Sequence, residues 1–369
     1  MRILDSKPAL RWLAPLAVVL VVGTSGLVAA TATADNKLPD RSAEQLLVDL
    51  QQAKVEGLSG TVVQQANLGI PAIPGAGGGD STDPTSMLSG THTMRVWYSG
   101  PDKARVALMG TYGETDLITN GTDVWTWSSK DQAATHRTLN SGEKAGDQKP
   151  AGEAPSGADV PKTPEEAAKW AIKALGPSTD ISTASDVTVA RQDAYELVLR
   201  PKDDRSLISE VRVAIDGATK LPLRVQAFGA GDTLVFEVAY TRVSFTKPGD
   251  DQFAFNPPAG TKVTEKATPE RKAPTQAERD EAKQAHEQAA NDTKTYGTGW
   301  TKVVVAKIPA DSKQGDQLKA FVNQLTPVSG GWGSGRLLAG TAFSAVLTDD
   351  GRIAVGAVEP ELLYEALAK

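Results

Sequence analysis

The chain changes its hydrophobic period after residue 53, from a helical repeat to the alternation of strands. Between Ser42 and Ala53 the apolar residues Ala43, Leu46, Leu47 and Leu50 recur at helical spacing, so we predict an amphipathic helix there. Beyond it, short segments of period two are separated by Gly, Asn, Asp or Pro. Eleven strands are predicted, at residues 59–65, 91–98, 103–109, 115–120, 123–127, 133–139, 187–190, 195–200, 209–215, 221–228 and 233–246.

Turn and cap residues connect these elements. Asn120-Gly121 is a two-residue hairpin signal, and the short turns at 216–217 and 229–231 predict that the last three strands form an antiparallel meander. A second helix is predicted from Thr163, a good N-cap followed by proline, to Leu175, where Gly176-Pro177 ends it.

The last long strand shows what the sheet buries. Leu234, Phe236, Val238 and Tyr240 alternate with the residues of its other face. A twisted sheet of this many strands curls on itself, and the two helices are available to cover its apolar face. We therefore predict a mainly β, α+β fold: a curled antiparallel half-barrel of about eleven strands with a helical lid. A space between sheet and lid would admit an apolar ligand, whereas tight packing would make an ordinary core, and the pattern alone permits both.

A smaller α+β unit is predicted after Gly299. It has a strand at 300–307, a helix at 311–325, a hairpin of strands 341–348 and 352–358 turning at Asp349-Asp350-Gly351, and a closing helix at 359–368. The domain prediction is a targeting segment at 1–34, the half-barrel at 35–265, a charged linker with helical potential at 266–298, and the C-terminal unit at 299–369.

The first 34 residues resemble an export signal. Three basic residues precede the uncharged stretch 12–34, and Ala32-Thr33-Ala34 has the small-x-small pattern of a cleavage site. The stretch is also long enough to span a bilayer, so an uncleaved anchor is the alternative. In both cases we expect the folded part outside the cytoplasm, either secreted or held at the outer face of the cytoplasmic membrane.

Composition excludes several kinds of chemistry. The chain has no Cys, three separated His and a formal net charge of −6, which argues against thiolate catalysis, Cys-type or His-type metal sites and nucleic-acid binding. Ser334 is not set in Gly-x-Ser-x-Gly, and no phosphate-binding loop is present. We therefore expect no enzyme activity, no cofactor and no metal.

Apolar and aromatic side chains are the remaining candidates for a binding site. Trp97, Trp125 and Trp127 fall close together in the predicted strands, where they could line a pocket or simply stack with neighbours. We predict a hydrophobic ligand cavity lined by Trp97, Leu108, Leu117, Trp125, Trp127, Leu234, Phe236 and Val238.

Several motifs in the right order resemble the LolA-type lipoprotein carriers of the bacterial envelope. They are Trp97 to Arg105, the run from Asn120 to Trp127, the hairpin between Ile215 and Pro222, and Phe253-Ala-Phe-Asn-Pro-Pro followed by Gly260. The resemblance covers about residues 42–265 and implies a half-barrel with a helical lid over a cavity for acyl chains. One departure is Gly100, which stands where the carriers have an arginine that latches the lid.

The same fold is used by mycobacterial lipid carriers and by RseB-type regulators, so the resemblance implies two functions. The first is binding of an acyl chain, lipid or lipidated protein, as a carrier or chaperone. The alternative is an RseB-like module that senses an envelope signal and binds a membrane anti-sigma factor. The Ala-, Gly-, Val- and Thr-rich composition is typical of a GC-rich bacterial genome, such as an actinobacterial one.

Overall fold

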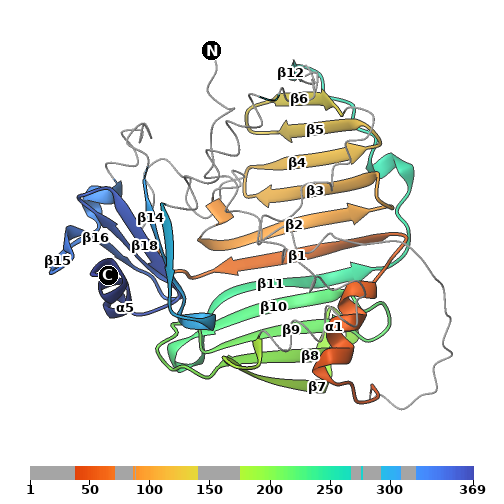
Figure 1. Cartoon of the computed structure of the whole chain (residues 1–369). Coiled ribbons are helices and arrows are strands. Elements are labelled where there is room, and N and C mark those ends of the chain that lie inside the picture. The colour runs from red at the N-terminus through yellow and green to blue at the C-terminus, as the bar shows by residue number, and fades with distance from the viewer. Residues whose placement is uncertain are drawn as a thin grey trace.

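Two sheets make up the part of the chain that the computed structural model describes, which is residues 38–70, 86–87, 89–139, 175–266, 276, 292–308 and 321–369. The larger sheet has twelve strands and the smaller has six (Figure 1). The large sheet is not closed into a barrel, and the predicted fold class is confirmed. The predicted targeting segment 1–34, nearly all of the second helix and most of the predicted linker lie outside the described residues.

The large sheet runs in the order β12-β6-β5-β4-β3-β2-β1-β11-β10-β9-β8-β7. Its strands are β1 (Leu58–Ala66), β2 (Gly90–Tyr98), β3 (Lys103–Gly110), β4 (Gly113–Asn120), β5 (Asp123–Ser128), β6 (Ala133–Thr138), β7 (Thr179–Val189), β8 (Gln192–Pro201), β9 (Glu210–Asp216), β10 (Pro222–Gly229), β11 (Thr233–Ser244) and β12 (Lys262–Lys266). All neighbouring pairs are antiparallel except β12 with β6, which is parallel.

All eleven predicted strands are present, and the meander of β9, β10 and β11 is confirmed. Two differences concern polar segments. β7 begins at Thr179, eight residues before the predicted start, and β12 was not predicted at all. Gly121 has a positive φ of 64°, which the two-residue turn between β4 and β5 requires.

The helix α1 (Ala43–Gln52) forms where the pattern predicted it. Ser42 caps it: the hydroxyl accepts from the Gln45 backbone N–H, and the Gln45 side chain accepts from the Ser42 N–H in return. Its apolar stripe packs on the sheet through the fully buried Leu46, which joins Tyr195, Leu197 and Ile215 in one cluster. A second cluster around Val62, Tyr98, Leu223 and Tyr240 forms the core near the middle strands.

The small sheet runs in the order β13-β14-β18-β17-β16-β15. Its elements are β13 (Thr293–Tyr296), β14 (Val303–Lys307), β15 (Thr326–Gly330), β16 (Gly333–Ala339), β17 (Ser344–Thr348), β18 (Arg352–Gly356) and the helix α5 (Pro360–Leu367). The predicted hairpin and closing helix are present, whereas β13, β15 and β16 were not predicted. β13 lies inside the range that we expected to be linker.

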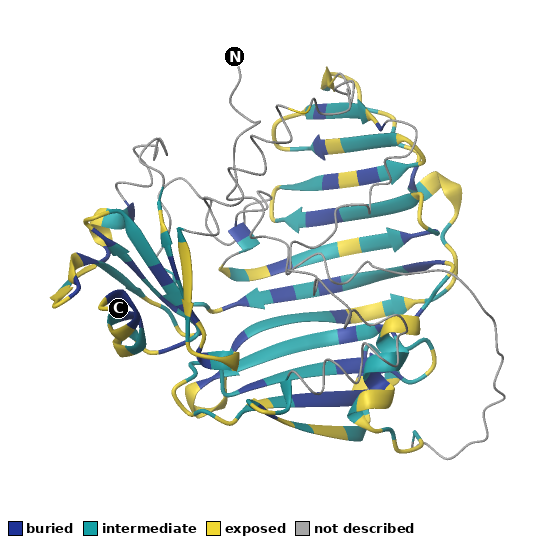
Figure 2. Ribbon diagram, in the orientation of Figure 1, coloured by how far each residue is buried: buried dark blue, intermediate teal, exposed yellow. Residues whose placement is uncertain are grey.

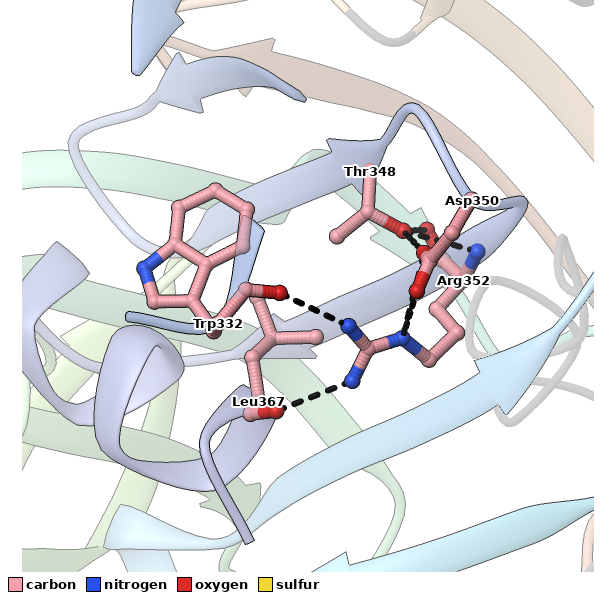
Figure 3. Close-up of polar contacts among 5 residues, drawn as sticks. All are labelled: Trp332, Thr348, Asp350, Arg352 and Leu367. Atoms are coloured by element: carbon pink, nitrogen blue, oxygen red, sulfur yellow. Dashed lines mark hydrogen bonds and ion pairs between the residues drawn. The ribbon is translucent and has the colours of Figure 1, made fainter. Parts of the chain in front are cut away.

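Arg352 ties three parts of this small unit together, as Figure 3 shows. Its guanidinium donates to the carbonyl of Leu367 at the end of α5 (2.9 Å), to the carbonyl of Trp332 (3.0 Å), and to the Asp350 carboxylate (2.8 Å). The carbonyl of Leu367 is one of those that a helix end leaves without an internal partner. Arg352 therefore caps α5 and holds it to the sheet.

The two units meet through backbone bonds at one end of the large sheet. The N–H of Leu207 donates to the Ala357 carbonyl (2.8 Å), and the N–H of Thr341 donates to the Leu68 carbonyl (3.0 Å). The indole N–H of Trp300 donates to Thr179 Oγ1 (2.8 Å). Because these contacts come from three separate loops, the small unit is fixed at several points. Among the described residues, no helix combines the length and apolarity needed to cross a membrane.

Candidate functional site: the two faces of the large sheet

Strand register assigns each side chain to one of two faces of the large sheet. Residues whose Cα atoms are directly paired point to the same side, and neighbours along a strand point to opposite sides. Leu197, which packs on α1, is paired in succession with Val213, Val225, Val238 and Gln64 across β8, β9, β10, β11 and β1. We call this side the α1 face and the other side the opposite face.

The α1 face carries rows of apolar side chains across the central strands. On β2, β3 and β4 it carries the row Val96, Val106 and Leu117, and beside it the pair Met94 and Leu108. The Leu117 side chain is 49% exposed, whereas Leu108 is only 6% exposed. Figure 2 shows α1 over the end of the sheet that contains β7–β9, where Tyr195, Leu197 and Ile215 are buried. The face is therefore packed beneath α1 and retains accessible apolar surface on the β2–β4 half.

A small apolar pocket opens on the α1 face where β1 begins and β11 ends. It is lined by Leu58, Leu221, Pro222, Leu223, Tyr240, Val243 and Phe245. Burial raises the pKa of Tyr240 to about 12, so the phenol is neutral at physiological pH. The wall of the pocket is thus uncharged as well as apolar.

Two buried polar side chains interrupt the α1 face. Gln64 on β1 is fully buried, and its neighbour across the strand pair, His92 on β2, is 2% exposed. The Gln64 amide donates to the Met87 carbonyl (3.0 Å), and His92 Nε2 lies 2.9 Å from the Ser89 carbonyl. These two contacts hold the segment around Met87 against the sheet.

The opposite face carries charged residues arranged in pairs. Arg224 binds Glu196 (2.8 Å), Glu210 binds both Arg200 and Arg212, and Arg105 binds the buried Asp116 (2.9 Å). Register places all of these residues on this side. These paired charges satisfy one another, so this part of the face is polar.

The tryptophans lie on the opposite face and have partners within the chain. Trp97 has the guanidinium groups of Arg95 and Arg105 at 5.2 Å each from its ring centre. The ring of Phe255 packs on Trp125 (5.2 Å) and on Trp127 (6.0 Å). The segment after β11, which contains the Phe253-Ala-Phe-Asn-Pro-Pro motif, therefore covers this part of the sheet, and Phe253 is 1% exposed.

His136 on β6 completes the aromatic group. Its ring stacks on Trp125 with 4.1 Å between ring centres. Nε2 lies 2.9 Å from the Asp123 carboxylate and Nδ1 lies 2.8 Å from that of Glu265 on β12. Burial lowers the pKa of His136, but hydrogen bonds and charge from Asp123 and Glu265 outweigh it, and the net pKa is raised above the ordinary value.

The eight residues of the predicted cavity do not come together as one lining. Leu108, Leu117, Phe236 and Val238 share the α1 face, while Trp97, Trp125 and Trp127 share the opposite face. The pairing of β10 with β11 shifts by one residue between Ala227 and Phe228, so Leu234 pairs with Phe228. Leu234 therefore does not share the face of Phe236. Gln64 and His92 were not identified from the sequence. The sequence signal for them would have been a polar residue at a position where the strand alternation expects an apolar one.

The α1 face combines accessible apolar surface with two buried polar side chains. Within the described ranges, no group of three His, Asp or Glu side chains is placed to hold a metal ion. The functional element that the geometry offers is the apolar α1 face with its buried Gln64 and His92. Such a face can hold an apolar chain by excluding water.

No protein-family model matches the chain, and no curated protein matches it. Among solved structures it is similar to the Pseudomonas aeruginosa MucA/MucB complex, with 16% identity, 88% of this chain, 96% of that chain and a TM-score of 0.41. It is also similar to a LolA superfamily protein from Nitrosomonas europaea, with 10% identity over 58% of this chain and 99% of that chain and a TM-score of 0.21. A third similar structure is a putative outer membrane lipoprotein-sorting protein domain from Vibrio parahaemolyticus, with 12% identity over 53% of this chain and 88% of that chain and a TM-score of 0.19.

At these identities and TM-scores the likenesses assign no ligand or partner to this chain. The neighbours are of the LolA and MucB/RseB types, which are the types that the sequence motifs resemble.

Proposed function

We propose that this chain is an extracytoplasmic binding protein that carries an acyl chain, as a lipid or a lipidated protein, on the α1 face of its large sheet. The observation that supports this most directly is the apolar row Val96, Val106 and Leu117, which lies on the same face as α1. Its two valines are partly buried, and Leu117 is 49% exposed. An apolar face that is half covered by a helix and half accessible is a common form of a binding site for greasy ligands.

The size of the face suits an acyl chain. From β1 to β5 it spans four strand spacings, or about 19 Å. Each methylene removed from water contributes about 0.8 kcal/mol, so a sixteen-carbon chain gains on the order of 12 kcal/mol before the cost of ordering. Burial alone therefore supplies enough free energy for binding, and no catalytic residue or cofactor is required.

The test uses two exposed apolar residues on opposite faces. Leu117 on the α1 face is 49% exposed, and Val263, paired with Ala134 on the opposite face, is 42% exposed. We expect Leu117→Glu to weaken binding of a fluorescent palmitoyl probe at least tenfold, because a carboxylate would be desolvated by the chain. Val263→Glu, the matched control, should bind as the unmodified protein does.

Native mass spectrometry of the protein purified without detergent is the second measurement. We expect adducts with the mass of a lipid on the unmodified protein and on Val263→Glu, and their loss from Leu117→Glu. A protein that never carries lipid and binds no acyl probe would overturn the proposal.

A second candidate is a regulatory module that binds the exported part of a membrane anti-sigma factor. The observation that favours it is the small unit, which an acyl carrier does not need and which is fixed to the large sheet through Leu207, Thr341 and Trp300. Pull-down from envelope fractions tests it. We expect Trp300→Ala to reduce capture of such a partner, and capture that is indifferent to the small unit would contradict this function.

A further inference from the structure

Gln64 is the one polar side chain of β1 on the α1 face, and its side-chain carbonyl oxygen has no partner. The side chain is 0% exposed, its amide nitrogen donates to the Met87 carbonyl, and Oε1 is buried without a hydrogen bond. That contact fixes the orientation of the amide, because the Met87 carbonyl only accepts and Nε2 is the end of the amide that can donate. Oε1 is therefore a buried acceptor without a donor.

Among the described residues around Oε1, the neighbouring side chains on β1 and β11 supply no donor. On β1 the flanking residues of the same face are Val62 and Ala66, 4% and 2% exposed, and the partner on β11 is Val238. A buried water needs two to four polar partners, and these three side chains offer none. A buried acceptor left unpaired is costly, so natural proteins keep few of them, and those that persist call for an explanation.

His92 on β2 is the neighbour of Gln64 on its other side. Since the Ser89 carbonyl can only accept, His92 Nε2 donates the proton of that 2.9 Å contact. This proton is therefore already used, and Gln64 Oε1 remains a buried acceptor without a donor.

We propose that the acyl ligand carries a hydrogen-bond donor, an amide N–H or a hydroxyl, next to its hydrocarbon chain, and that Gln64 Oε1 accepts from it. This inference rests on the proposed function, since it places the ligand on the α1 face. The hydrocarbon lies on the row through Val96 and Leu117, and the donor end lies at Gln64 beneath the segment around Met87. The site thereby distinguishes N-acyl and hydroxyl-bearing lipids from esters that have no donor.

The experiment compares three ligands of equal chain length in competition with a fluorescent palmitoyl probe: palmitamide, hexadecan-1-ol and methyl palmitate. A hydrogen bond gained at a buried acceptor should make the two donor-bearing ligands bind about three- to tenfold more tightly than the ester. In Gln64→Met, which is close to isosteric, we expect all three to bind with the affinity of the ester.

Gln65→Met is the control, because Gln65 is the next residue on the same strand and points to the opposite face. It should keep the preference of the unmodified protein. The inference is overturned if the unmodified protein shows no preference among ligands that it binds, or if the preference survives in Gln64→Met, and the proposed function stands in both cases. If none of the ligands binds, both fail.

Discussion

His136 holds the edge strand β12 to the large sheet through contacts that depend on its charge. The imidazole lies between the Asp123 carboxylate on β5 and the Glu265 carboxylate on β12, with Trp125 stacked on its face. These two carboxylates are the charged groups in contact with the ring. β12 itself is exposed at every residue, and among the described strands it pairs with β6 alone, so the His136–Glu265 contact adds a side-chain link to the backbone pairing.

The sign of the pH effect follows from the raised pKa. Burial lowers the pKa of His136, but the combined effect of Asp123 and Glu265 is to raise it by more than this. The pKa in the folded state therefore lies above 6.5. The folded state binds this proton more tightly than the unfolded state does. The resulting stability is complete below about pH 6.5 and is lost as the pH rises through the folded pKa.

Solvent screening limits the free energy that the two His136 ion pairs contribute. The Asp123 and Glu265 side chains are 48% and 69% exposed, so each ion pair contributes about 0.5 kcal/mol. Loss of both should raise the opening equilibrium of β12 about fivefold. Stacking on Trp125 remains in the neutral ring and does not add to the change.

Two measurements check this. NMR titration of the His136 Cε1 proton should give a pKa above 6.5, lowered towards 6.5 by Glu265→Gln. Hydrogen exchange of the β12 amides, corrected for the intrinsic rate, should show protection falling as the pH rises above about 6.5, and His136→Gln should abolish the dependence. A His136 pKa at or below 6.5, or β12 protection that is independent of pH, would refute the reasoning.

Two further substitutions test the charged pairs. Arg105→Met should lower the free energy of unfolding by about 3 kcal/mol, because it leaves the 1%-exposed carboxylate of Asp116 unpaired. Adding Asp116→Asn removes the unpaired charge and should restore part of the lost free energy of unfolding, measured by urea denaturation. A double variant that is no more stable than Arg105→Met alone would contradict this explanation. Arg352→Met should destabilise the small unit by about 3 kcal/mol through its lost hydrogen bonds to Leu367, Trp332 and Asp350. Arg352→Lys, which keeps the charge near Asp350, should cost less, as followed by near-UV circular dichroism of the stacked Trp332 and Tyr364.

The strands that the sequence predicts are those that bury their own apolar face. The sequence predicts α1 from the helical spacing of its apolar residues Ala43, Leu46, Leu47 and Leu50, and it predicts the meander from its short turns. The missed strand β12 reads Lys-Val-Thr-Glu-Lys and is wholly exposed, so it has no hydrophobic period to detect. It exists because β6 offers an edge to pair with, a partner far away in sequence.

The small unit also contains strands that local hydrophobic periodicity does not predict. β16 begins Gly-Ser-Gly, and glycine is depleted in strands because it has no side chain to pack. Gly335 lies where the backbone of Leu347 on β17 would be 2.3 Å from an added Cβ, so close approach of the two strands requires glycine there. Such a requirement comes from the partner strand, which local periodicity does not report.

The separation of the two faces, by contrast, was accessible from the sequence. The two-residue turn Gly121-Thr122 pairs Asn120 with Asp123, which makes Ile118 the partner of Trp125 and leaves Leu117 on the other side. The hairpin turn by itself thus assigns Leu117 and the tryptophans of β5 to opposite faces. The opposite face has ion-paired charges and tryptophan rings that pack against Phe255, which is why the proposed ligand site is placed on the face of Leu117. The tryptophans, which drew attention as rare residues, are better explained as the platform on which the segment after β11 packs.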